Sequence, residues 1–213
     1  MADTPAQPRR PRRSPGAGER QRDPERTKAR ILDAAKAEFG AKGFAAARIS
    51  DIADRAGVNK QLISYYFGGK EGLYTELADR WRETSAAMAR PEAPLDAVVA
   101  GFVMSTVHDW DWARLMAWVN MSGSAEQTPA SEAEAQFMRA QVTELKNRQA
   151  AGEIPADLDP GCLLLALFAA ASATVTLPRI AELISGADPQ SATFTSRYAE
   201  QLALLVRHLQ HPA

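Results

Sequence analysis

The stretch from Ile49 to Lys70 constrains the fold of this chain more than any other. Apolar residues recur at helical spacing on both sides of Gly57, namely Ile52, Ala53 and Ala56 before it and Val58, Ile63 and Phe67 after it. Two helices this short cannot be stable alone, so they must pack crosswise on each other and on a third element. Gly57 supplies the backbone freedom that the corner between them requires. The stretch therefore predicts a helix-turn-helix.

Charge divides the chain into two unlike parts. Residues 1–90 hold 18 Lys and Arg against 12 Asp and Glu, whereas residues 91–213 hold 7 against 14. A basic N-terminal part suggests a polyanionic partner, and chance clustering of solvated charges is the alternative. Because the basic part contains the helix-turn-helix, we favour nucleic acid as the partner.

Several spaced motifs resemble the DNA-binding domain of the TetR family of repressors. They are Ile-Ala-x-x-Ala-Gly-Val at 52–58, Tyr-Tyr-Phe at 65–67 and Gly-Lys-Glu-Gly-Leu-Tyr at 69–74, preceded by Ile31-Leu32-Asp33-Ala34-Ala35, Phe39 and Gly43. The resemblance covers about residues 26–77. It implies an all-α fold, in which an N-terminal three-helix DNA-binding domain with the helix-turn-helix is fused to a larger helical domain for ligand binding and dimerisation.

Three segments are expected. Residues 1–23 are rich in Arg and Pro and should be a disordered basic arm, which either follows DNA or only solubilises the chain. Residues 24–90 form the DNA-binding domain with its connecting helix, and residues 91–213 form the effector-binding and dimerisation domain. Helical patterns predict helices at about 24–41, 50–55, 60–67, 70–89, 95–108, 112–121, 131–151, 163–176, 181–184 and 194–209.

The helix at 60–67 is the predicted recognition helix. Since Val58, Ile63 and Phe67 face the core, the opposite face enters a major groove with Lys60, Gln61, Leu62 and Ser64. Lys can donate to guanine, Gln can pair with adenine, and Leu can pack on a thymine methyl group.

The resemblance also implies contacts to phosphate. Tyr65, Tyr66 and Lys70 fit phosphate-contacting positions of the family, although core packing is the alternative for the tyrosines. Arg48 stands where the family usually has Thr, and Ser64 where it often has Tyr. Ser50 is expected to cap the helix at 50–55, and the N-terminus of that helix would point its amides at a phosphate.

The helices at 163–176 and 194–209 are the predicted dimer interface. The first is apolar almost all round, which predicts burial on all sides, and the second carries a stripe of Tyr198, Leu202, Leu205 and Leu209. TetR-like proteins dimerise through such a C-terminal pair, and a homodimer would fit a near-palindromic double-stranded DNA operator. The alternative is that both helices belong to the core of one chain.

Aromatic and Met side chains suggest a second site in the larger domain. Rings and thioethers can line an apolar ligand cavity, with His and Trp nitrogens as polar contacts, and plain core packing is the alternative. The candidates for a small-molecule effector are Phe102, Met104, His108, Trp110, Met116, Trp118 and Met121, with Trp112 between them.

Composition disfavours several other classes of protein. A single cysteine, Cys162, excludes an intrachain disulfide or a multi-cysteine metal site, and its apolar surroundings predict a buried thiol. With three histidines in the chain, neither a metal site nor a catalytic triad has support, so no enzyme activity and no cofactor are expected. The basic N-terminus is no secretory signal, and the apolar run at 162–178 is too short for a membrane span. A cytoplasmic, nucleoid-associated protein is expected.

These observations predict a sequence-specific DNA-binding transcriptional regulator, specifically a repressor that a small-molecule effector releases from its operator. Two alternatives stay open. One is a ligand carrier or small enzyme with a vestigial DNA-binding head, and the other is an activator or an effector-independent DNA-binding protein.

Overall fold

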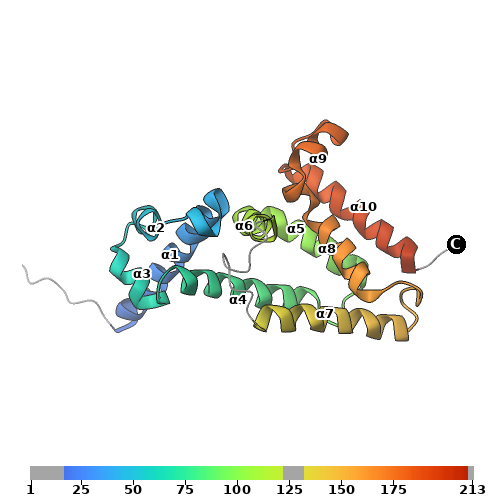
Figure 1. Ribbon diagram of the computed structural model, residues 1–213, viewed down its shortest axis with the longest axis horizontal. Coiled ribbons are helices and arrows are strands. Elements are labelled where there is room, and N and C mark those ends of the chain that lie inside the picture. The colour runs from blue at the N-terminus through green and yellow to red at the C-terminus, as the bar shows by residue number, and fades with distance from the viewer. Residues whose placement is uncertain (1–16, 122–131, 211–213) are drawn as a thin grey trace, which may run out of the picture.

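The computed structural model describes residues 17–121 and 132–210, with side chains from Pro24 onward. All regular elements in these ranges are helices, which confirms the predicted all-α fold (Figure 1). They are α1 (Ala17–Ala46), α2 (Ile49–Ala56), α3 (Lys60–Phe67), α4 (Lys70–Met88), α5 (Leu95–His108), α6 (Trp110–Met121), α7 (Glu132–Ala150), α8 (Pro160–Thr176), α9 (Pro178–Ser185) and α10 (Ala192–Gln210).

The helix-turn-helix consists of α2 and α3, and α3 has the predicted bounds. Gly57 ends α2 in the left-handed conformation, with φ 62°, and its amide donates to the carbonyl of Asp54. The side chain of Asn59 then accepts a hydrogen bond from the amide of Gln61 at 2.9 Å and caps α3. Gly68 ends α3, again in the left-handed conformation. The corner is thus built by residues whose local chemistry favours it.

The predicted bounds of the first two helices were wrong. α1 begins at Ala17 and not at Pro24, so residues 17–23 of the predicted disordered arm are helical and Pro24 lies inside the helix. The rest of that arm, residues 1–16, lies outside the described residues. At its other end α1 continues past residue 41 across Gly43, whose φ of 76° and ψ of 164° are accessible mainly to glycine. α2 begins at Ile49, which places Ser50 inside the helix. Arg48 occupies the N-cap position with an extended backbone and no capping hydrogen bond from its side chain.

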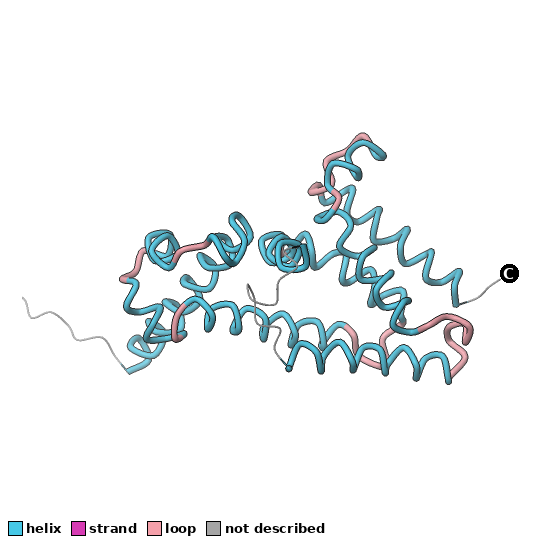
Figure 2. Tube along the Cα trace, in the orientation of Figure 1, coloured by secondary structure: helices cyan, strands magenta, loops and turns pink. Residues whose placement is uncertain are grey.

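α4 connects the head, formed by α1–α3, to the body. It extends from α3 along one side of the molecule, and α7 lies near its C-terminal half (Figure 1). The body continues with α5, α8 and α10, and α9 projects at one end. Loops join α7 to α8 and α9 to α10 (Figure 2). This arrangement leaves the head and the C-terminal helices at opposite ends of the molecule.

The buried apolar residues form two separate clusters. The head cluster combines α1–α4 with two residues of α6, Trp112 and Leu115. The body cluster combines residues of α5, α7, α8 and α10 with Ile154 from the α7–α8 connection. The most extensive helix contacts match this division, since they join α1 to α6 and α5 to α10. Residues 110–121, which the sequence prediction grouped with the effector domain, pack mainly on α1 and also contact α8 and α5.

The predictions that α8 is buried on all sides and that Cys162 is a buried thiol were wrong for the single chain. The outer face of α8 is exposed, with Leu165 at 70% and Cys162 also exposed. In α10 the buried positions include Leu202 and Val206, while Leu205 of the predicted stripe is exposed. No single described helix has the length and hydropathy of a membrane span; α8 and α9 reach these values only together, and they are bent by 82° relative to each other.

Candidate nucleic-acid interface

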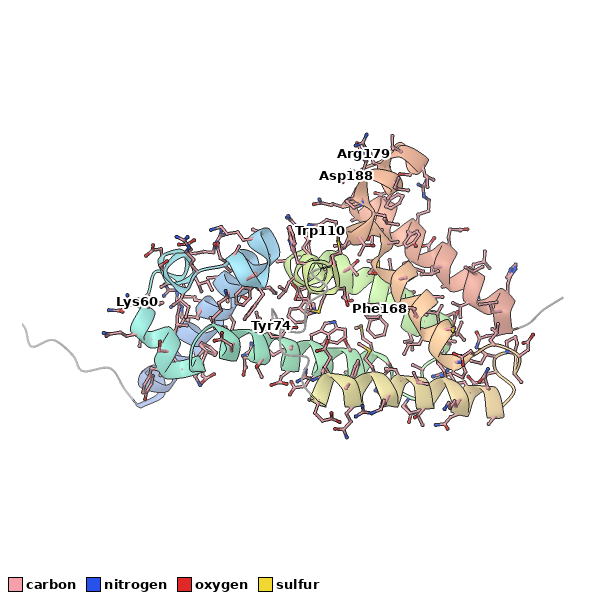
Figure 3. All side chains as sticks on the ribbon, viewed as in Figure 1. Lys60, Tyr74, Trp110, Phe168, Arg179 and Asp188 are labelled. Carbon is pink, nitrogen blue, oxygen red and sulfur yellow. The ribbon has the colours of Figure 1, made fainter. Side chains whose placement is uncertain are left out.

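The outer face of α3 presents most of the predicted base-reading residues to solvent. Lys60, Gln61 and Ser64 are exposed, and the ring of Tyr65 is 79% exposed. Lys60 lies at the end of the head that is far from the body, and its side chain points outward (Figure 3). Ile63 holds the opposite face because it is fully buried in the head cluster. One face of a single eight-residue helix therefore carries an ammonium, an amide, a hydroxyl and a phenol.

The side chains of Leu62 and Tyr66 are less accessible to DNA than predicted. Both are partly buried and pack against the head cluster beside Ile63. Tyr66 also contacts Tyr65 edge-on, with 5.1 Å between ring centroids, and the Lys28 ammonium lies 5.7 Å from its ring centre. The apolar stripe of α3 is wider than the sequence reading assumed, since residues 62 and 66 are one turn apart and flank the buried position.

The start of α2 presents a second group of polar atoms. Arg48 and Ser50 are both exposed, as predicted for phosphate contacts. Because the side chain of Arg48 does not cap α2, it does not occupy the first amides of the helix, and a helix N-terminus attracts anions. The Ser50 hydroxyl donates to the Asp51 carboxylate at 3.1 Å. Arg48 and the helix amides are thus more favourable ligands for a phosphate than the Ser50 hydroxyl.

Lys70 has a structural contact that the sequence reading did not foresee. Its ammonium donates to the carbonyl of Ala45 at 3.0 Å and lies 4.6 Å from the centre of the Phe44 ring. Partial burial lowers the pKa of Lys70. The side chain joins the start of α4 to the end of α1. A phosphate would therefore compete with the Ala45 carbonyl and the Phe44 ring for the Lys70 ammonium.

An ion-pair network fixes α2 against α1. Glu38 is only 3% exposed and pairs with Lys42 one turn later and with Arg55 of α2 at 3.7 Å. Lys42 also contacts Asp51 of α2 at 2.8 Å. Hydrogen bonding to Lys42 lowers the pKa of Asp51, and hydrogen bonding to Asp51 raises that of Lys42.

The sequence reading missed this network. The spacing of Glu38 and Lys42 by four residues was its only detectable signal, since the Arg55 and Asp51 contacts join different helices. Arg30 adds another contact between these helices, because its guanidinium donates to the carbonyl of Ala56 at the end of α2. These contacts orient α2, and through Gly57 they orient α3.

The predicted effector residues do not lie together. Phe102 and Met104 pack against the body cluster, whereas Met116 packs against the head cluster. His108 is exposed, with Nδ1 2.8 Å from the carbonyl oxygen of Met104. The remaining three lie along α6, where Trp110 is partly buried and Trp118 and Met121 are exposed.

Two further features bear on the predicted effector site. A hollow of about 730 Å³ beside α4 is lined by polar side chains and includes none of the predicted effector residues; it is formed by Glu76, Asp79, Arg80, Arg82, Glu83 and Thr84. Among the described residues, three buried polar atoms of α4, α6 and α8 lack a hydrogen-bond partner: Ser85 Oγ, Trp112 Nε1 and Thr174 Oγ1.

Both parts of the chain match known protein families. The pattern described as "Bacterial regulatory proteins, tetR family" matches residues 31–77, and the pattern described as "Tetracyclin repressor-like, C-terminal domain" matches residues 95–204. The HTH-type transcriptional repressor SCO4008 of Streptomyces coelicolor is 34% identical over 171 residues, which are 78% of this chain and 86% of that protein.

Solved structures show the same architecture. A putative transcriptional regulator from Streptomyces coelicolor, SCO4942, aligns with a TM-score of 0.69 and 25% identity over 88% of this chain and 99% of its own. NalD, the secondary repressor of the MexAB-OprM multidrug efflux pump in Pseudomonas aeruginosa, aligns with a TM-score of 0.62 and 20% identity over 89% and 99% of the two chains, which shows a shared fold.

Proposed function

This chain belongs to the TetR family of DNA-binding transcriptional regulators, and we propose that it is a homodimeric repressor that a small molecule releases from its operator. The observation that carries the proposal is the exposed face of α3. A lysine, a glutamine and a tyrosine stand there on a helix whose other face is locked into the head. Lys60 and Gln61 read base edges in the major groove, and Tyr65 and Arg48 contact the backbone.

Exposed apolar side chains support the homodimer. Outside the head and α6, the large exposed apolar residues of the described chain all lie on or between α8 and α10; they are Leu165, Phe168, Leu177, Ile180, Leu183, Ile184, Leu204 and Leu205. Apart from Phe168, which projects toward the side of α4 and α7 (Figure 3), these residues form an apolar surface of the kind that marks an interface. A second copy packed on α8 and α10 would give two recognition helices, which fits a near-palindromic operator.

The partly buried rings and unpartnered polar atoms of the body support an effector. Phe168 projects from α8 toward the side of α4 and α7 (Figure 3). Trp81 of α4 and Phe137 of α7 contact each other edge-on, with 5.5 Å between ring centroids. An effector with apolar surface and hydrogen-bonding groups would suit these rings and the polar atoms of Ser85 and Thr174. It releases DNA only if it prefers a body shape that misplaces the heads. Since the operator is chromosomal DNA, the protein acts in the cytoplasm.

The test of DNA recognition uses Lys60→Ala and Tyr65→Ala on an operator selected from random duplex DNA by the unmodified protein. Losing one base contact should weaken binding by about tenfold or more for Lys60→Ala. Tyr65→Ala should weaken binding to all sequences alike, since a phosphate contact reads no base. Lys146→Ala, which removes an exposed lysine of α7, is the control and should leave affinity unchanged. Equal affinity for all four proteins would exclude α3 as the recognition helix.

Repression is tested separately by locating the selected operator relative to the promoter and measuring transcription. A site that overlaps a promoter, with transcription from it reduced by the protein in a purified system, is expected. A site upstream of the promoter with increased transcription would identify an activator instead.

A further inference from the structure

We propose that the basic start of α1 is a second DNA-contacting element, which binds the phosphate backbone of the duplex that flanks the half-site read by α3. The contact is independent of base sequence. This inference rests on the proposed entry of α3 into the major groove. It concerns residues 1–30, which precede the part of the head that the family pattern matches.

The first observation is where the charge of the head lies. Residues 1–30 hold nine Lys and Arg against four Asp and Glu, whereas residues 31–90 hold nine against eight. The part of the head that contains the helix-turn-helix is therefore almost neutral, and the basic excess is concentrated at the N-terminal end. Neutralised phosphates supply the sequence-independent affinity of a protein for DNA. The N-terminal end is thus the part of the head that is best suited to this contact.

The second observation is the position of this end beside α3. The Lys28 ammonium lies 5.7 Å from the centre of the Tyr66 ring, and Tyr66 contacts the exposed Tyr65 edge-on. Arg30 donates to the carbonyl of Ala56 at the corner of the helix-turn-helix. The first turns of α1 lie at the end of the head that carries α3, far from the body (Figure 1). A duplex bound to α3 would therefore pass close to the start of α1.

The third observation is a row of arginines along α1. Arg22, Arg26 and Arg30 follow one another at intervals of four residues, so they lie along one side of the helix. Arg26 and Arg30 are exposed. Because Arg30 contacts the corner of the helix-turn-helix, the row leads outward from that corner toward the N-terminal end. A row of this kind can follow a phosphate backbone beyond the bases that α3 reads.

The fourth observation is the composition of the first two turns of α1. Residues 17–23 are helical, although apart from Ala17 and Gly18 they are polar or charged. A segment with so little apolar surface gains almost nothing from packing on a core, so burial in the head does not account for this extension of the helix. Residues 1–16 lie outside the described residues, and their sequence adds four arginines directly before α1: Arg9, Arg10, Arg12 and Arg13.

The salt dependence of DNA binding tests the proposal with the whole protein. The probe is an operator selected from random duplex DNA by the unmodified protein. It is used with flanks of about one helical turn, ten base pairs, and also trimmed to the bases that α3 reads. Affinity is measured from about 50 to 200 mM salt.

Two variants remove the proposed contacts. One combines Arg22→Gln with Arg26→Gln, and the other lacks residues 2–16. The matched control combines Arg139→Gln with Lys146→Gln, because it removes two positive charges from exposed positions of α7. Circular dichroism of each protein checks that the fold is kept.

We expect both variants to depend less steeply on salt with the long operator. Each lost phosphate contact should reduce the slope of log affinity against log salt by about 0.9, which gives about 1.8 for the two arginines of α1 and up to about 3.6 for residues 2–16. At the lowest salt the truncated protein should bind about tenfold or more weakly. The preference for the operator over random duplex should stay unchanged, since phosphate contacts read no base.

Trimming the flanks provides the matching change in the DNA. It should weaken binding of the unmodified protein and leave the truncated protein nearly unchanged. Equal loss in both proteins would overturn the proposal, and so would unchanged slopes in both variants or an equal change in the α7 control, which would show an effect of net charge alone. Base reading by α3 fails separately, if Lys60→Ala keeps the full preference for the operator.

Discussion

Tyr74 shows how one side chain responds to its surroundings. It is 5% exposed and lies between the rings of Phe44 and Trp112, with centroid distances of 5.4 and 6.3 Å. Burial raises its pKa to about 12, because the ionised phenol would lose its hydration. The neutral phenol is therefore the form that the folded head accommodates.

Alkaline titration should detect this residue. The unfolded phenol ionises near pH 10, so the stability linked to neutral Tyr74 is complete below about pH 10 and is lost as the pH rises toward the folded pKa of about 12. Absorbance at the phenolate wavelength should show a late-titrating tyrosine that Tyr74→Phe removes. Tyr65→Phe, at an exposed position, is the control and should leave the late titration unchanged. A late phenolate of equal amplitude in Tyr74→Phe would contradict the assignment.

Arg148 is a second residue with an unusual environment. Its side chain is almost fully buried at the end of α7 and donates to the carbonyls of Pro91 and Ala93 at 3.1 and 2.9 Å. It also pairs with Glu144 at 3.2 Å and Glu153 at 3.0 Å. A guanidinium can satisfy several acceptors in a fixed geometry, so this side chain joins α7 to the α4–α5 connection.

Arg148→Met should therefore destabilise the body strongly. Removing the buried guanidinium leaves the carbonyls of Pro91 and Ala93 without their donor, which costs about 2 kcal/mol. Arg139→Met is the matched control on the same helix, because its pair with Glu132 is exposed and contributes about 1 kcal/mol or less. Denaturant unfolding monitored by circular dichroism measures both changes. Equal losses of unfolding free energy would contradict a special role for Arg148.

Among the elements, the recognition helix depends on its cap. Asn59 is the only described side chain that caps α3, since it accepts from the Gln61 amide. Asn59→Ala should cost about 1 kcal/mol of stability, and Asn59→Ser should restore most of it, because serine caps as well as asparagine. Hydrogen exchange at the first amides of α3 checks the local effect. Unchanged exchange in Asn59→Ala would show that the cap does not hold the helix start.

The helix-turn-helix was predictable because its signals are local. Gly57, Asn59 and Gly68 favour the turn, the cap and the stop at the places where the structure has them. The start of α1 was not predictable, because a proline such as Pro24 is also compatible with the first turn of a helix. The width of the apolar face of α3 was also misjudged. Leu62 packs against the core of the whole head, and the pattern of α3 alone does not reveal that contact.

At the scale of the whole molecule, the exposed face of α8 leads to a prediction about assembly. Leu165→Glu should weaken the proposed dimer, because it buries a charge at an apolar interface. Sedimentation over a range of concentrations should show a larger fraction of monomer. Met121→Glu, at an exposed position on α6, should leave the dimer unchanged. A dimer of equal strength in Leu165→Glu would place the interface elsewhere.

The sequence did not reveal the association of α6 with the head. Helix periodicity identified residues 112–121 as helical and apolar, and adjacency in the chain grouped them with the body. The contact with α1 joins residues far apart in sequence, and it is encoded by the absence of side chains at Gly40 and Gly43. Hydrophobic patterns record which faces are buried, and they do not record which partner buries them.

The division of the core also determines how regulators of this architecture can be recombined. A chimera joined in the connection at 89–94 would keep the head of one parent and take α6 from the other. The foreign helix would then meet Gly40, where the structure leaves no room for a side chain or a shifted backbone. Transferring DNA specificity together with its coupling to the body would instead require exchanging two separate segments, residues 17–88 and residues 110–121, so that both sides of this contact come from the same parent.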